Sequence, residues 1–265
     1  MTGLDGYTET TFTHDGKTRT VFRRGEGPAV IVISEIPGIT PLVADFGRRV
    51  AEAGFTAVLP SLFGTPGKEP NGAYIAQSVA FACVSKEFAT WATNKTSPAT
   101  VWARALARHE HEQCGGPGVG VVGMCLTGNF ALAMMVDPVV AAPVLSQPSL
   151  PFVLNKAHRA DVNLSPEDLA AVKARCAAEP DLCVLGLRFT GDRMAPGERF
   201  ETLRRELGDS FVGVEIDSSK GNPHGIKAIA HSVLTEDLVD EPGHPTQDAL
   251  NQVLDLFRTR LTPTA

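Results

Sequence analysis

The stretch that decides the fold is Val119-Gly120-Val121-Val122-Gly123-Met124-Cys125-Leu126-Thr127-Gly128-Asn129-Phe130-Ala131-Leu132-Ala133. An apolar run ends at Gly123, a cysteine follows two residues later, and Gly128 opens a run of good helix formers. This order predicts a buried strand, a tight turn and a helix, which together are the layout of a nucleophile elbow. In that motif the nucleophile stands on a strained turn, usually within the pattern G-x-S-x-G.

Here the pattern is Gly123-x-Cys125-x-x-Gly128, with cysteine at the nucleophile position and Thr127 where the second glycine is expected. Glycine before the nucleophile and a small residue after it keep side chains away from the turn. The turn would place the Cys125 sulfur at a helix N-terminus, where the partial positive charge favours thiolate over thiol. A buried structural cysteine is the competing interpretation, since free cysteine is among the most buried residue types. Possible acid and base partners elsewhere in the chain favour the interpretation of Cys125 as a nucleophile.

The composition describes an ordinary globular protein of 265 residues, with 43% hydrophobic and 20% charged residues. A net charge of −6 and the lack of a basic patch argue against a nucleic-acid or anionic-membrane partner. The first 17 residues do not resemble a signal peptide, and no apolar stretch approaches the roughly 20 residues of a membrane helix. Five cysteines without C-x-x-C spacing suit free thiols in a reducing compartment, so we expect a cytoplasmic protein.

Apolar runs and helical patterns alternate along most of the chain. The run at residues 29–33, the helical pattern at 42–53 and the run at 55–59 form a βαβ unit, which implies parallel pairing. A hairpin is expected at residues 8–13 and 18–23, with further strands at 118–122, 139–145, 182–190 and 211–216, and helices at 74–91, 98–113, 128–136, 165–178, 196–207 and 246–261. Residues 1–265 are therefore predicted to form one α/β domain, with helices on both faces of a mostly parallel sheet.

Reactive side chains follow four of the predicted strands, and ligands of such sheets bind beyond the carboxyl ends of strands. Glu35, Cys125 and Asp192 each follow a strand, and a histidine follows the last one. A thiol nucleophile needs a nearby base, and that base needs a carboxylate that fixes its tautomer. The chain order nucleophile, acid, histidine is the one expected of α/β-hydrolases. Asp192 fits the acid, although an N-terminal cap of the following helix would explain it equally well.

Two histidines compete for the role of base, and spacing alone does not choose between them. His224 lies a few residues beyond the last strand, and His231 lies nearer the closing helix. The other histidines are in polar contexts, and His109 and His111 diverge on a helix and cannot chelate one metal. Because no zinc-type spacing occurs either, we expect neither a metal nor another cofactor.

At these residues the sequence resembles the dienelactone hydrolase family of cysteine-dependent α/β-hydrolases. The resemblance covers residues from about 29 to 261. It is carried by Ser34-Glu35-Ile36-Pro37-Gly38, Gly123-Met124-Cys125-Leu126-Thr127-Gly128, Gly191-Asp192 and Ala230-His231-Ser232. It implies an α/β-hydrolase fold. The distance from the family's histidine to the L-D-F of its last helix matches that from His231 to Leu254-Asp255-Leu256, so the resemblance favours His231 as the base.

The resemblance also implies roles for residues beside the triad. The family's glutamate after the first buried strand contacts the resting thiol, and this role falls on Glu35. Its oxyanion donors are backbone amides, which correspond to Leu126 and Ile36. The implied activity is hydrolysis of small esters or lactones by a Cys125-His231-Asp192 triad. In that triad the histidine takes the thiol proton, and the reaction passes through a thioester intermediate. The expected partner is thus a small molecule, with no nucleic acid or membrane, and the oligomeric state is left open.

One departure from the family concerns the substrate. Family members that act on dienelactone hold its carboxylate with arginines, one of them four residues after the histidine. This chain has Thr235 there, and residues 70–95 offer Lys86 and Lys95 but no arginine. Lysine lacks the bidentate fork of arginine. The resemblance therefore implies the mechanism more firmly than it implies dienelactone.

Two other functions are compatible with parts of the pattern. A non-enzymatic thiol redox sensor or ligand-binding relative of the same fold would use Cys125 as an oxidisable thiol, but it would not need Asp192. In a nucleotide-binding Rossmann-type protein, the stretch around Cys125 would be a phosphate-binding loop. That stretch lacks G-x-G-x-x-G and follows a middle strand rather than the first.

Overall fold

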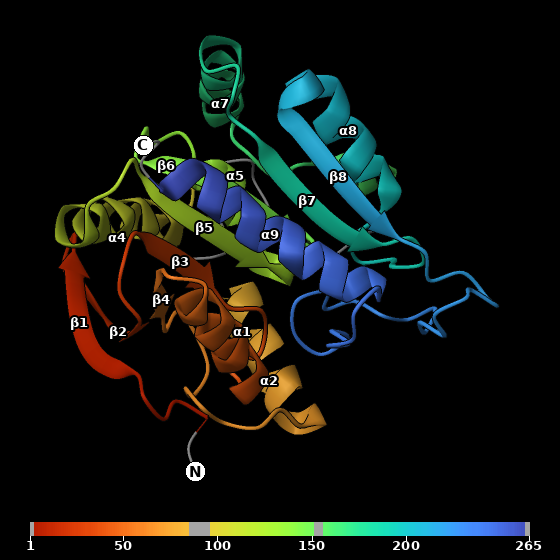
Figure 1. Ribbon diagram of the computed structural model, residues 1–265, viewed down its shortest axis with the longest axis horizontal. Coiled ribbons are helices and arrows are strands. Elements are labelled where there is room, and N and C mark those ends of the chain that lie inside the picture. Colours follow the sequence, from red (N-terminus) through yellow and green to blue (C-terminus); the bar gives the residue numbers. More distant parts are fainter. Residues whose placement is uncertain (1–2, 85–95, 151–155, 263–265) are drawn as a thin grey trace.

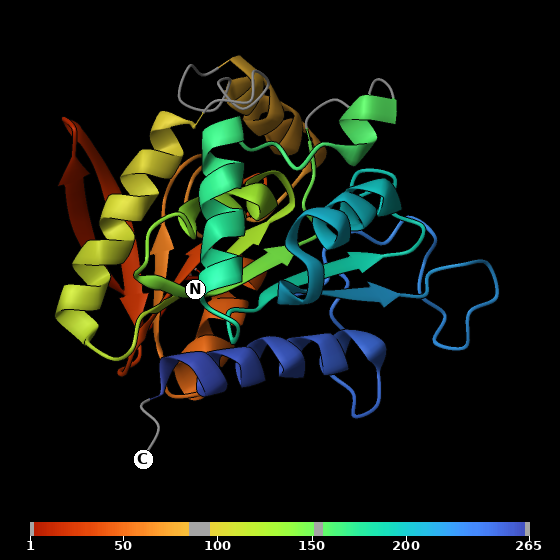
Figure 2. The same ribbon diagram turned by 90° about the horizontal axis from the view of Figure 1, so that it is seen from above.

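The computed structural model describes residues 3–84, 96–150 and 156–262. Eight strands form one sheet in the order β1-β2-β4-β3-β5-β6-β7-β8, and helices cover both of its faces (Figures 1 and 2). The strands are β1 (Thr8–His14), β2 (Lys17–Arg24), β3 (Ala29–Ile33), β4 (Thr56–Pro60), β5 (Val119–Met124), β6 (Val140–Ser146), β7 (Val184–Phe189) and β8 (Phe211–Ile216).

The sheet is antiparallel only at one side. β1 pairs with β2 and β2 pairs with β4 in antiparallel register, and every later pair, from β4–β3 to β7–β8, is parallel. The N-terminal hairpin is thus added to a parallel sheet of six strands. The prediction of an α/β fold with a mostly parallel sheet is confirmed.

The central strands are apolar throughout because both of their faces are covered. In β3, Val30 and Val32 point into one core, and Ile31 and Ile33 point into the other. Every residue of β3 is buried. The apolar run that predicted this strand therefore reflects two helical layers rather than one.

Two layers of helices produce these two cores (Figure 2). One face is covered by α1 (Pro41–Glu52) and α9 (Pro245–Leu261), whose Phe46 and Phe257 are fully buried. The other face is covered by α4 (Pro98–Cys114), α5 (Gly128–Met134), α7 (Pro166–Ala178) and α8 (Gly197–Leu207). The remaining α-helices of the described residues are α2 (Gly72–Val84) and α6 (Lys156–Ala160).

Helix starts follow the capping chemistry of the sequence. The hydroxyls of Thr40, Ser97 and Ser165 each accept a hydrogen bond from a backbone amide in the first turn of α1, α4 and α7. A proline follows each of these caps at the first helical position, where its missing N–H costs nothing.

The predicted elements match the observed ones to within a few residues, with three additions, one of them a short 3-10 helix at Gly208–Ser210. Helix α6 lies in the stretch after β6 that carried no prediction of structure, and a short 3-10 helix occupies Cys125–Thr127. The helix expected at residues 74–91 is observed as α2 up to Val84, and residues 85–91 lie outside the described residues. Lys86 and Lys95 lie outside them as well.

The order of strands fixes where a ligand crevice should lie. From β3 the chain passes first to β4 on one side and later to β5 on the other, so the strand order reverses between β3 and β5. Ligands of open α/β sheets bind beyond the carboxyl ends of the strands at such a point. Glu35 follows β3 and Cys125 follows β5, so both stand where such a crevice is expected.

Candidate active site

Cys125 stands on a strained turn between β5 and α5. Its φ is 53°, in the left-handed region that residues other than glycine seldom adopt. The turn is tight enough that a Cβ on Gly123 would lie 2.1 Å from the carbonyl oxygen of Thr127, and one on Gly128 would lie 2.6 Å from the Cα of Pro148. The two glycines of the motif are therefore required by close contacts with the backbone.

The Thr127 hydroxyl connects the elbow to the neighbouring strand. It accepts a hydrogen bond from the backbone N–H of Met124 at 3.0 Å. Its proton faces the carbonyls of Ile33 at 2.9 Å, Met124 at 2.9 Å and Ser34 at 3.2 Å. The residue that replaces the second glycine thus ties the end of β5 to the end of β3.

Asp192 and His231 form a buried pair beside the elbow. Asp192 Oδ2 lies 2.6 Å from His231 Nδ1, and only 3% of the Asp192 side chain is exposed. The other carboxylate oxygen accepts the backbone N–H of Met194 at 2.8 Å, so the carboxylate is fixed on both sides. This is the arrangement that fixes the tautomer and orientation of an imidazole.

The environment of His231 holds a proton on its ring. Burial lowers its pKa, but the hydrogen bond with Asp192 and the adjacent Cys125 side chain act in the opposite direction and raise it to about 11. The Nε2 atom is buried, and no other described side chain or backbone group accepts its proton. The ring therefore lies between the Asp192 carboxylate and the Cys125 side chain, and both groups favour its protonated form.

His224, the other candidate from the sequence, lies elsewhere. Its side chain is exposed, and its ring packs edge-on against His244 with centroids 5.4 Å apart. The structure thus brings together Cys125, Asp192 and His231, and it leaves His224 outside the group.

Glu35 is buried within a set of neutral hydrogen-bond donors. Thr235 Oγ1 donates to one carboxylate oxygen. The other oxygen accepts from Ser232 Oγ at 2.7 Å and from Gln147 Nε2 at 3.1 Å. Among the described residues no hydrogen bond joins Glu35 to Cys125. In this conformation the carboxylate joins the ends of β3 and β6 to the segment that carries His231.

Gln147 is a site residue that the sequence did not indicate. It follows β6 with a φ of 35° and is fully buried. Its amide nitrogen donates to Glu35, and its oxygen accepts from Ser146 Oγ and, at 3.4 Å, from the backbone N–H of Val233. A non-glycine residue in the left-handed region at a strand end would have been a signal, but a backbone angle is not visible in the sequence.

The two residues expected to supply oxyanion donors, Leu126 and Ile36, lie just after β5 and β3. Leu126 is the second residue of the 3-10 helix that begins at Cys125, and the first N–H groups of a helix have no carbonyl within it to bind. Ile36 follows Glu35 and is half-buried, and it packs in the same hydrophobic core as Cys125. The carbonyl of Cys125 accepts the N–H of Ser149 at 2.8 Å, which fixes the turn from its other side.

Arg199 is a second residue that sequence reasoning missed. Its guanidinium is completely buried and donates to the backbone carbonyls of Pro148, His158, Asp161 and Met194. Burial lowers its pKa to about 10, with Asp161 and Asp192 acting in the opposite direction, so it stays charged at neutral pH. It joins the segment after β6 to the segment that carries Asp192. On a helix, an arginine normally indicates a solvated face.

Metal ligands and membrane spans can be assessed for the described residues only. No group of three or more His, Cys, Asp or Glu side chains there could hold a metal ion. None of the helices described in this structure has the length and apolarity that crossing a bilayer requires.

The fold and the strand-end position of these groups define an α/β-hydrolase-like protein. The sequence model of the dienelactone hydrolase family matches residues 18–261, so the chain belongs to this family of hydrolases.

Solved structures of several family members are similar to this chain. The dienelactone hydrolase-like promiscuous phosphotriesterase P91 from metagenomic libraries is 16% identical, with a TM-score of 0.64 over 96% of this chain and 98% of that one. The dienelactone hydrolase of Anabaena variabilis ATCC 29413 is 15% identical, with a TM-score of 0.59 over 97% and 99%. At these identities the likeness shows the fold.

A sequence relative matches a shorter part of the chain. The Escherichia coli K12 hydrolase fragment YghX is 41% identical over 59 residues, which are 21% of this chain and 50% of that protein. The chain therefore matches half the length of this relative.

Proposed function

We propose that this protein hydrolyses small esters or lactones through an acyl-enzyme formed on Cys125, with His231 and Asp192 as its partners. The observation that carries the proposal is the position of the His231 ring, bound to Asp192 at 2.6 Å and adjacent to the Cys125 side chain on its strained turn. Membership of a hydrolase family supports the reaction class.

In the proposed first half-reaction, His231 acts as the base and takes the proton of the Cys125 thiol. The raised pKa of His231 supports this, because a ring with a raised pKa binds the transferred proton more strongly. The sulfur attacks the carbonyl carbon, and the negative charge moves to the carbonyl oxygen. The amides of Leu126 and Ile36 would stabilise that oxyanion, and one such donor is worth on the order of 10²–10³ in rate. As the carbonyl reforms, the C–O bond breaks and His231 gives its Nε2 proton to the departing alkoxide.

In the second half-reaction, the neutral His231 takes a proton from water. The resulting hydroxide attacks the thioester carbonyl, and the same two amides stabilise the oxyanion. The C–S bond then breaks, the carboxylic acid is released, and the thiolate–imidazolium pair is restored. The balance is ester plus water giving acid plus alcohol, with no redox change. Asp192 holds the ring in place and stabilises its positive charge throughout.

Glu35 and Thr235 bear on the choice of substrate. Thr235 occupies the position at which dienelactone-hydrolysing relatives carry an arginine, and its hydroxyl donates to Glu35. This position therefore adds no positive charge to the crevice. The proposed substrates are small esters and lactones as a class, without a requirement for the dienelactone carboxylate. Glu35 restrains the thiol only if its carboxylate leaves Ser232 and Thr235.

Replacement of Cys125 tests the proposal. We expect Cys125→Ala to lower the kcat/KM for a short-chain aryl ester by about 10³-fold or more, since loss of a nucleophile removes the whole covalent route. Cys114→Ala is the matched control, because Cys114 is a half-buried thiol without a disulfide at the end of α4, where it accepts a hydrogen bond from Arg23 of β2. A Cys125→Ala protein with wild-type turnover would refute the proposal. Stoichiometric oxidation of Cys125 without any turnover would favour the redox-sensor alternative.

A further inference from the structure

The segment that carries His231 has no helix or strand of its own. Between the end of β8 at Ile216 and the start of α9 at Pro245 the chain forms only turns and bends. Figure 1 shows this connection, in blue, running along one end of the sheet before it enters α9. Irregular backbone is less constrained than a strand end, yet a base must keep its orientation to a fraction of an ångström. Something in the segment must supply that precision.

The Asp237 carboxylate closes this segment onto the base. Its Oδ2 accepts the backbone N–H of His231 at 2.8 Å and that of Ser232 at 3.1 Å. The backbone N–H of Asp237 in turn donates to the carbonyl of Ser232 at 3.0 Å. Residues 231–237 therefore form a closed loop in which one carboxylate binds two consecutive amides.

Apolar anchors hold the closed loop against the core. Val233 and Leu234 lie between the two ends of the loop and are fully buried in the core beneath α1 and α9. With these side chains fixed, the two amide contacts of Asp237 determine the direction of the backbone at His231. They also fix Ser232, whose hydroxyl donates to Glu35.

We propose that Asp237 is a positioning residue for the reaction, which holds the His231 backbone so that Nδ1 meets Asp192 and Nε2 faces Cys125. The inference rests on the proposed function for its catalytic consequence, and on the two amide contacts for its geometry. A charged acceptor suits this role because hydrogen bonds to a carboxylate are shorter and about twice as strong as neutral ones.

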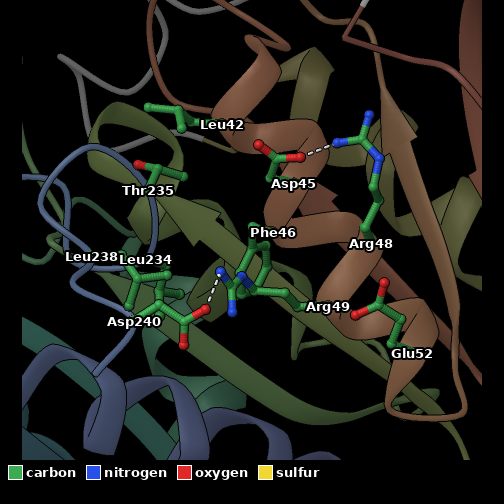
Figure 3. Close-up of a pocket in the computed structure, with 10 residues that line it drawn as sticks. All are labelled: Leu42, Asp45, Phe46, Arg48, Arg49, Glu52, Leu234, Thr235, Leu238 and Asp240. Carbon is green, nitrogen blue, oxygen red and sulfur yellow. Dashed lines mark hydrogen bonds and ion pairs between the residues drawn. The ribbon is translucent and has the colours of Figure 1, made fainter. Parts of the chain in front are cut away.

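A second aspartate in the same segment provides a matched control. Asp240 pairs with Arg49 of α1 at 2.9 Å, at the rim of a surface cavity of about 370 Å³ (Figure 3). Its side chain is 58% exposed, and none of its recorded contacts is with the base. Replacement of Asp240 should therefore change the attachment of the segment to α1 without changing the orientation of His231.

The experiment compares Asp237→Ala, Asp237→Asn and Asp240→Asn in aryl ester hydrolysis and in an NMR titration of the His231 ring. We expect Asp237→Ala to lower kcat by about 10²-fold with little change in KM, the size of effect that a 1 Å misplacement has. The His231 pKa should also fall, because the ring is no longer aligned for its hydrogen bond with the Asp192 carboxylate. Asp237→Asn, which keeps an oxygen acceptor, should recover at least a tenth of the wild-type kcat, and Asp240→Asn should match the wild type.

Two results would overturn the inference. One is a folded Asp237→Ala protein with the wild-type kcat and the wild-type His231 pKa. The other is an Asp237→Asn protein as impaired as Asp237→Ala, which would exclude acceptor geometry as the cause. If Asp237→Ala does not fold, Asp237→Ser replaces it, since the shorter hydroxyl cannot reach both amides and should give the same loss. The NMR titration needs no turnover, so failure of the proposed function, seen as full activity of Cys125→Ala, is distinguishable from failure of the positioning role.

Discussion

The two halves of the candidate active site are built in opposite ways. The elbow that carries Cys125 is built largely from the nearby residues Gly123, Thr127 and Gly128, whose close contacts also reach the end of β3 and the segment after β6. The segment that carries His231 depends on distant partners, Asp192 at 39 residues and Glu35 at 197 residues of separation. The elbow is fixed by close backbone contacts, and the base segment is fixed by side chains that bind backbone amides and hydroxyls.

This difference determines how each half responds to change. A strained turn with no free space has no room for an added atom. Substitutions there therefore cause steric clashes and lower the stability of the fold. In a segment held by hydrogen bonds, a substitution first changes the orientation and the pKa of the base, while the fold persists. We therefore expect substitutions there to change kcat and its pH dependence.

Replacement of the base should have the largest effect. We expect His231→Ala to lower kcat/KM by about 10³-fold, because both proton transfers pass through its ring. His224→Ala should stay within about twofold of the wild type, since substitutions at exposed positions seldom matter more. Steady-state kinetics on one aryl ester measure both variants. Equal losses for the two histidines would contradict the assignment of the base.

A methyl group added to the elbow should destabilise the fold. In Gly123→Ala the new Cβ would lie 2.1 Å from a backbone oxygen, which no side-chain rotation relieves. We expect a loss of about 3 kcal/mol in the free energy of unfolding, at the upper end of overpacking effects. Gly72→Ala is the control, because nothing lies within 4 Å of the added Cβ there. Urea unfolding followed by circular dichroism measures both, and a Gly123→Ala protein as stable as the control would show that the turn is not tight.

Replacement of Asp192 by asparagine should move the alkaline limb of the kcat/KM pH profile to lower pH. Asp192 raises the pKa of His231, so in Asp192→Asn the ring should lose its proton at lower pH. The kcat/KM should then decline at least one pH unit earlier than in the wild type, which corresponds to about 1.4 kcal/mol of lost interaction. The variant should be more impaired at pH 9 than at pH 6. A parallel decrease at every pH would mean that Asp192 does not act through the charge of the ring.

Loss of the surface ion pair between Arg49 and Asp240 should have the smallest effect. Arg49 and Asp240 are both partly exposed, and such pairs contribute less than about 1 kcal/mol. We expect Arg49→Ala to lower the melting temperature slightly and to leave kcat unchanged. Thermal unfolding and kinetics on the same preparation check this. A large loss of kcat would show that the orientation of the base depends on its attachment to α1.

The fold was largely predictable from the sequence because its signals are local. Two-sided burial makes runs such as residues 29–33 wholly apolar, and the caps at Thr40, Ser97 and Ser165 mark helix starts. The elbow was visible for the same reason, since its glycines stand at fixed distances from Cys125.

The supports of the site were not predictable, because they depend on backbone angles and long-range contacts. Gln147 adopts a φ of 35° at a strand end, and Asp237 binds amides in a loop without any periodic pattern. The choice between His224 and His231 needed either a family resemblance or the observed pair with Asp192, because the distance along an irregular chain does not determine position. Arg199 reads as a solvated residue in sequence, although it is completely buried.

In the proposed reaction Cys125 carries the acyl group during turnover. The most direct measurement is rapid acid quench of the enzyme with a slowly hydrolysed aryl ester, followed by mass spectrometry of the intact chain and of its peptides. We expect one added acyl group, located on the peptide that contains Cys125 and absent from Cys125→Ala. Turnover at the wild-type rate with no acyl group on that peptide, or with the group on another residue, would contradict it.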